Sequence, residues 1–115
     1  MASYINALGA AGARTVPLIF NNPNTTEELE KLDKINGVFY CGGDAVGDYW
    51  TFGKKIYEKV KGMNDKGNYM PAWGTCLGFQ YLATYAATTG LEVLSENAFN
   101  SNDDNYPLKF LVPAN

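Results

Sequence analysis

Hydrophobic positions along the chain fall into two alternating patterns. In one pattern, apolar residues recur every three or four positions, as on the buried side of a helix. This pattern predicts helices over residues 4–12, 25–32, 48–63 and 77–90. In the other, short continuous apolar runs lie between turn residues and predict strands over residues 14–19, 37–41, 69–73, 91–94 and 106–112. Helices that alternate with short strands are typical of an α/β fold with a mostly parallel sheet.

Polar residues and glycines at the ends of these segments predict where the helices begin and end. Ser3 is placed to cap the first helix, and Gly12 is placed to close it. Thr25 and Glu28 have the spacing of a capping box at the start of the second helix. Asp48 is the expected cap of the third helix.

The edge strands of the predicted sheet have no partner strands within these 115 residues. A length of 115 residues corresponds to one domain at most, since domains commonly run to about 100–200 residues. A sheet made only from these strands leaves its edges unpaired, and unpaired edges invite further strands. We therefore expect residues 1–115 to be a partial domain, completed by a complementary segment or by a protein partner.

Composition and charge narrow the function classes. The net charge of −3 provides no basic surface for nucleic acid. No apolar run approaches the ~20 residues that a membrane-spanning helix needs. The first residues lack the basic region and apolar core of a signal peptide. Two cysteines without any histidine are too few for a disulfide framework or a zinc site, so we expect no metal and no cofactor.

The most informative segment is residues 71–80. An apolar run meets Gly74, Cys76 and Gly78, and a helical pattern follows directly. Gly-x-Cys-x-Gly between a strand and a helix is the thiol form of the nucleophile elbow, in which a sharp turn exposes the reactive side chain. A cysteine at a helix N-terminus is favoured as thiolate, its reactive form. Cys76 is therefore a candidate nucleophile, and a buried inert cysteine is the alternative.

The chain lacks the usual partner of such a nucleophile. A cysteine hydrolase needs a general base, normally histidine, and the sequence contains none. Cys76 is therefore not expected to complete a catalytic cycle within these 115 residues alone.

The preceding strand ends in a second glycine pair, Gly42 and Gly43. The pair forms either a simple turn at the strand end or a loop whose N–H groups stabilise an oxyanion. Asp44, Asp48 and Tyr49 follow it and are candidates to line a cleft. Cys41 is either a small buried residue or a redox partner of Cys76, which would require a Cα separation below about 7 Å.

These segments resemble the γ-glutamyl hydrolase family. The segment Trp73–Phe79, with the string Trp-Gly-Thr-Cys-Leu-Gly-Phe, is fairly specific to that family. The resemblance covers nearly the whole chain, in order. Its other parts are Ser3-Tyr4-Ile5, Ala11-Gly12-Ala13-Arg14, Val16-Pro17, Ile35-Asn36-Gly37-Val38, Gly42-Gly43, Tyr69-Met70-Pro71-Ala72 and Tyr106-Pro107-Leu108.

The resemblance implies a fold and a reaction. The fold is that of the class I glutamine amidotransferases, a flavodoxin-like three-layer α/β sandwich of which this chain is an incomplete, nucleophile-bearing part. The implied reaction is cleavage of γ-glutamyl bonds in poly-γ-glutamates, typically of folates, through a thioester on Cys76. The N–H of Leu77 and one from Gly42 or Gly43 hold the oxyanion. The family's catalytic His and Glu would lie after Asn115, and its first strand before Met1.

The resemblance also suggests a lysosomal, vacuolar or secreted location. Two other interpretations remain open. The chain could be a catalytically inactive, truncated relative that serves as a structural subunit of a larger assembly. It could also be another amidotransferase-like hydrolase, which the Trp73–Phe79 string disfavours.

Overall fold

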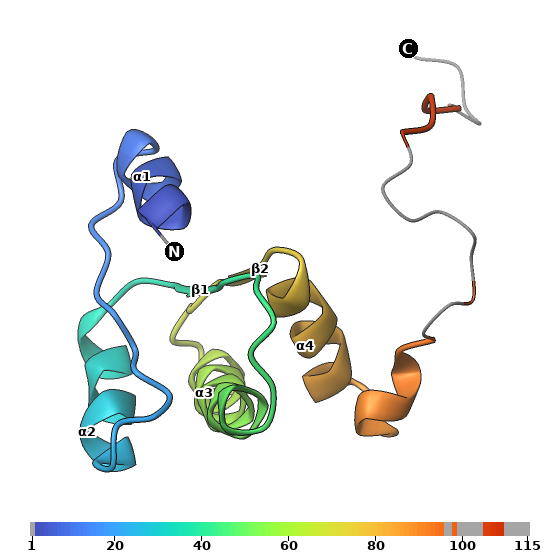
Figure 1. The fold of residues 1–115 in the computed structure, drawn as a ribbon. Helices are drawn as coiled ribbons and strands as arrows, with labels where there is room; N and C mark the ends of the chain where they lie inside the picture. Colours follow the sequence, from blue (N-terminus) through green and yellow to red (C-terminus); the bar gives the residue numbers. More distant parts are fainter. Residues whose placement is uncertain (1, 96–97, 99–104, 110–115) are drawn as a thin grey trace.

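A small parallel sheet with helices around it forms the centre of the protein. The computed structural model describes residues 2–95, 98 and 105–109. The elements are α1 (Ala2–Ala10), α2 (Thr25–Glu30), the 3-10 helix η1 (Lys31–Lys34), β1 (Val38–Tyr40), α3 (Asp48–Asp65), β2 (Ala72–Gly74), α4 (Leu77–Ala86) and the 3-10 helix η2 (Gly90–Val93). Strands β1 and β2 pair in parallel, with Phe39 opposite Trp73 (Figure 1). The fold is therefore mixed α/β, as predicted.

Helices contact both faces of the two strands. Successive residues of a strand point to opposite faces. On one face, the Phe39 ring packs against Tyr4 of α1 with centroids 5.4 Å apart. On the other, Tyr40 packs against Tyr85 of α4, and its hydroxyl donates a hydrogen bond to the Gly53 carbonyl of α3 at 3.2 Å. Figure 1 shows α1 on one side of the strands and α3 on the other.

The core lies on the α3 and α4 side. Helix α3 buries Phe52, Ile56 and Val60 at four-residue intervals, as predicted, while Met63 is half-buried. The buried hydrophobic residues form one cluster, consisting of Leu32, Val38, Tyr40, Phe52, Ile56, Val60, Met70, Tyr81 and Tyr85. Because the cluster joins β1 to α3 and α4, it holds both helices against the sheet.

Two predicted strands are wrong. Residues 14–19 have no ladder partner within the described ranges, and the Ile19 N–H donates instead to the Glu28 carboxylate at 2.9 Å. Residues 91–94 lie largely in η2, where the Leu94 N–H donates to the Leu91 carbonyl at 3.1 Å. A strand needs a neighbour for its hydrogen bonds, and neither segment has one here. Of the strand predicted over residues 106–112, positions 106–109 are not in a strand and the others lie outside the described residues.

The predicted caps also need correction. Asn24, rather than Thr25, caps α2, with its side-chain oxygen accepting from the Glu27 N–H at 3.2 Å. Glu28 is buried and binds Lys31 at 2.8 Å. The Glu28 carboxylate also accepts from the side-chain amide of Asn22 at 2.6 Å. The Thr25–Glu28 capping box is therefore wrong, because Glu28 ties down the preceding segment instead.

The remaining helix ends differ by a few residues. Ser3 lies inside α1, which begins at Ala2, while Gly12 follows the helix with a φ of +87°. Asp48 is the first residue of α3, behind an N-cap at Gly47. Helix α4 ends at Ala86, before the predicted Gly90. Every helix in the described ranges falls short of the length and apolarity required to traverse a bilayer.

Candidate active site

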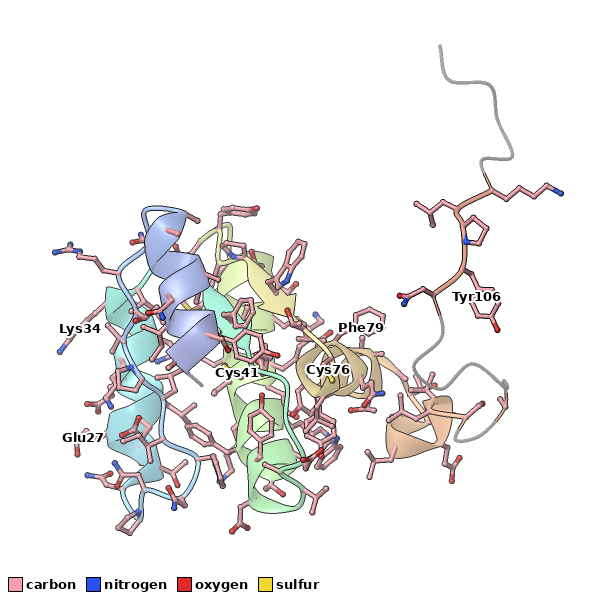
Figure 2. The ribbon with its side chains drawn as sticks, turned by 45° about the horizontal axis from the view of Figure 1, so that its top comes forward. Glu27, Lys34, Cys41, Cys76, Phe79 and Tyr106 are labelled. Carbon is pink, nitrogen blue, oxygen red and sulfur yellow. The ribbon has the colours of Figure 1, made fainter. Side chains whose placement is uncertain are left out.

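Cys76 occupies a strained turn between β2 and α4. It is the N-cap of α4, with φ 54° and ψ −121°. Of the described residues, it is the one non-glycine residue with positive φ. Such a conformation costs about 1–3 kcal/mol and is concentrated at functional sites. The side chain is exposed, and Figure 2 shows its sulfur at the start of α4. The turn therefore presents the thiol to solvent at a helix N-terminus, as the elbow pattern predicts.

The two flanking glycines permit the turn by close backbone packing. A Cβ on Gly78 would collide with the Tyr40 carbonyl group of β1. A Cβ on Gly74 would lie 2.6 Å from the Phe79 nitrogen of α4. Hydrogen bonds join the same elements, since the Thr75 N–H donates to the Tyr40 carbonyl at 3.2 Å. The Gly-x-Cys-x-Gly spacing therefore reflects direct contact of strand and helix backbones.

The structure brings Gly42 next to Cys76. A Cβ built on Gly42 would lie 2.9 Å from the Cys76 Cβ and 3.2 Å from the Thr75 carbonyl oxygen. Gly43 differs, because it has a φ of +145° and open space where its Cβ would be. Gly42 therefore adjoins the thiol-bearing residue, and Gly43 gives the following loop its backbone freedom.

Two tyrosine hydroxyls hold the loop that contains this glycine pair. Tyr49 of α3 donates to the Cys41 carbonyl at 2.9 Å, at the start of the loop. Tyr81 of α4 donates to the Ala45 carbonyl at 3.0 Å, further along it. Burial raises the pKa of Tyr49 to about 12, so this hydroxyl keeps its proton at neutral pH. Tyr49 was predicted to line a cleft, but its hydroxyl instead holds the loop by a hydrogen bond. The pattern of apolar positions gave no sign that Tyr81 also binds this loop.

Leu77 begins α4 directly after the cysteine. The first N–H groups of a helix have no partner within the helix. The Gln80 N–H already bonds the Cys76 carbonyl at 3.1 Å. The Leu77 N–H is therefore one of the donors available beside the Cys76 side chain.

The other candidate residues, Cys41, Asp44 and Asp48, make no hydrogen bond to Cys76 in the described part of the chain. Cys41 is half-buried and burial raises the pKa of its thiol. Both cysteines are free thiols, without a disulfide between them. Asp44 and Asp48 are exposed. Within the described ranges, no three Cys, Asp or Glu side chains gather as metal ligands.

A pocket of about 330 Å³ lies beside the elbow, between the start of α3, the start of α4 and η2. Its walls are mostly apolar, with few hydrogen-bonding groups. The lining residues are Val46, Gly47, Trp50, Thr51, Leu77, Gln80, Tyr81, Leu91 and Leu94. The pocket lies at the carboxyl end of the strands, where open α/β sheets bind their ligands.

Curated γ-glutamyl hydrolases are similar to this chain, although no family model matches it. Gamma-glutamyl hydrolase 1 of Arabidopsis thaliana is 38% identical over 99% of this chain and 32% of its own length. Gamma-glutamyl hydrolase B of Dictyostelium discoideum is 37% identical over 96% of this chain and 32% of its own length. The Bos taurus gamma-glutamyl hydrolase is 39% identical over 83% of this chain and 30% of its own length.

The chain therefore spans about a third of the length of these relatives. The similarity extends over nearly all 115 residues, through both glycine pairs and the elbow, and confirms the resemblance that the Trp73–Phe79 string predicts. This protein chain belongs to the γ-glutamyl hydrolase family.

Proposed function

We propose that Cys76 is the nucleophile of a γ-glutamyl hydrolase and that this chain is the part carrying it. The observation that supports this most directly is the backbone of Cys76, held at positive φ at the start of α4 with its side chain exposed. Strain of this kind persists only where the surrounding packing enforces it. Here the packing of Gly74 and Gly78 against neighbouring backbone enforces it.

The reaction is acyl transfer. The Cys76 sulfur attacks the γ-carbonyl carbon of a poly-γ-glutamyl substrate, typically a folate derivative, and the C–N bond then breaks to leave a thioester. Water hydrolyses the thioester and regenerates the thiol. The N–H groups of Leu77 and of Gly42 or Gly43 stabilise the oxyanion of each tetrahedral intermediate. The proximity of Gly42 to Cys76 favours Gly42 over Gly43 in the pair.

The general base comes from outside these 115 residues, because the sequence has no histidine. In the proposed whole protein, a His and a Glu two residues apart supply this base. The segment that carries them also completes a three-layer sandwich around β1 and β2. Residues 1–115 then form the nucleophile-bearing part of one domain. The coverage of about a third of each relative supports this arrangement.

An activated γ-glutamyl ester tests the nucleophile without the missing base. A p-nitrophenyl leaving group departs without protonation, so the acyl group can transfer to Cys76 as p-nitrophenolate is released. We expect intact-mass analysis and peptide mapping to place one γ-glutamyl group on Cys76. Cys41→Ala should still be labelled, whereas Cys76→Ala should not. Labelling of Cys41, or equal labelling by the α-linked glutamyl ester, would contradict the proposal.

The absence of histidine also favours a second candidate, an inactive relative that serves as a structural subunit. The intact mass of the native protein, with peptide mapping past Asn115, separates the two. A longer protein with a downstream His-x-Glu pair supports the hydrolase. A native mass matching 115 residues, with no turnover of poly-γ-glutamate, supports the structural subunit.

A further inference from the structure

A tyrosine from the N-terminal helix reaches the candidate site. The Tyr4 hydroxyl oxygen lies 2.5 Å from the position that a Cβ on Gly42 would occupy. The Cys76 Cβ lies 2.9 Å from that same point. The hydroxyl and the cysteine side chain are therefore neighbours on one side of Gly42, although α1 and α4 are far apart in the sequence.

The Tyr4 ring is held in place while its hydroxyl stays uncommitted. The ring packs against Phe39 of β1 at 5.4 Å, and the side chain is half-buried. Within residues 2–95, 98 and 105–109, no hydrogen bond uses the Tyr4 hydroxyl. A fixed aromatic ring with a free phenolic O–H is a preorganised donor, because little order is lost when it binds an acceptor.

The neighbouring tyrosine hydroxyls are already in use. Tyr49 donates to the Cys41 carbonyl and Tyr81 donates to the Ala45 carbonyl. Both bonds fix the loop and leave those O–H groups pointing at backbone. Tyr4 alone of the three brings a free donor to the side of Gly42 that faces Cys76.

We infer that Tyr4 is a further catalytic residue, whose hydroxyl donates a hydrogen bond to the oxyanion formed when Cys76 attacks a γ-glutamyl carbonyl. The inference rests on the proposed nucleophile. It adds a side-chain donor, carried by α1, to the backbone donors of Leu77 and Gly42. Such a donor acts in the transition state, where negative charge develops on the carbonyl oxygen.

Two reactions of the same thiol separate this role from a structural one. Acyl transfer from the γ-glutamyl p-nitrophenyl ester develops an oxyanion. Alkylation by iodoacetamide displaces iodide at a tetrahedral carbon and develops none. We expect Tyr4→Phe, which keeps the ring, to slow acylation of Cys76 roughly 10- to 100-fold. The rate of alkylation by iodoacetamide should stay at the wild-type value.

Tyr69→Phe is the matched control. It removes the same oxygen from a tyrosine that is 81% exposed and precedes β2 at the opposite end of the sheet. Both of its rates should equal those of the wild type. Unchanged acylation in Tyr4→Phe, or an equal loss of acylation and alkylation, would overturn the inference. Failure of the wild type to form a γ-glutamyl thioester, with normal alkylation, would overturn the nucleophile proposal and the role of Tyr4 together.

Discussion

The first 23 described residues and the segment from Leu32 to Tyr85 differ sharply in packing. Residues 2–24 contain no buried side chain. The nine buried hydrophobic residues found among the described positions all lie from Leu32 to Tyr85. Yet the N-terminal region supplies Tyr4, which adjoins Gly42 and Cys76. The region that builds the core is therefore distinct from the region that brings Tyr4 beside Gly42.

Side-chain truncation on each side of this division gives the largest expected contrast. Ile56 is 5% exposed in α3, and Ile5 is 49% exposed in α1. We expect Ile56→Ala to lower the free energy of unfolding by about 3–4 kcal/mol, because it leaves a cavity in the core. Ile5→Ala should change it by less than about 0.5 kcal/mol. Urea denaturation measures both, and similar losses would show that α1 is packed as tightly as α3.

Two glycine substitutions test the close packing at the elbow. Gly78→Ala places a methyl group against the Tyr40 carbonyl, which belongs to a hydrogen-bonded strand and has little room to move. We expect a loss of about 2–3 kcal/mol in the free energy of unfolding. Gly62→Ala, in α3 with nothing within 4 Å of the new Cβ, should instead stabilise by about 0.5–1 kcal/mol. A neutral Gly78→Ala would show that the elbow tolerates a wider turn.

A third, pH-dependent effect concerns the contacts by which Glu28 joins the N-terminal region to α2. The Lys31 hydrogen bond, and then the Ile19 N–H, lower the pKa of Glu28 from 4.5 to about 2. Since protonation favours the unfolded chain, the contribution of Glu28 to stability is complete above pH 4.5. That contribution is lost as the pH falls through about 2.

Unfolding free energy followed from neutral pH to about pH 2 measures this contribution. We expect Glu28→Gln to flatten the acid limb of the profile. The exposed Glu58, which has no ion-pair partner among the described residues, gives the control Glu58→Gln for loss of one charge. Equal flattening by both variants would show that net charge, rather than the Glu28 contacts, governs the acid limb.

Apolar periodicity and glycine spacing predicted α3 and the elbow, because each of these elements depends on residues that are close together in the sequence. The period of α3 follows from Phe52, Ile56 and Val60, and the elbow follows from glycine spacing around Cys76. Residues 14–19 and 91–94 were predicted as strands from the same kind of apolar run. That prediction failed because a strand also requires a neighbour, which the run itself does not specify.

The candidate site was predictable only in part, for a related reason. The glycine spacing identified Cys76, and the apolar strand ending in Gly42 identified the neighbouring loop. The positions of Tyr4 and Tyr81 depend on how whole helices dock, and nothing in their immediate sequence signals the approach. Glu28 is similar, because its helical spacing suggested a capping role, whereas its carboxylate binds the segment before the helix.

The two tyrosine bonds to the loop after β1 have a consequence for motion. Tyr49 and Tyr81 attach the Cys41 and Ala45 carbonyls to two different helices, both anchored in the core. A local fluctuation that opened this loop would have to break both bonds while α3 and α4 stayed in place. The loop therefore moves with the docked α3 and α4 unless both hydrogen bonds break together.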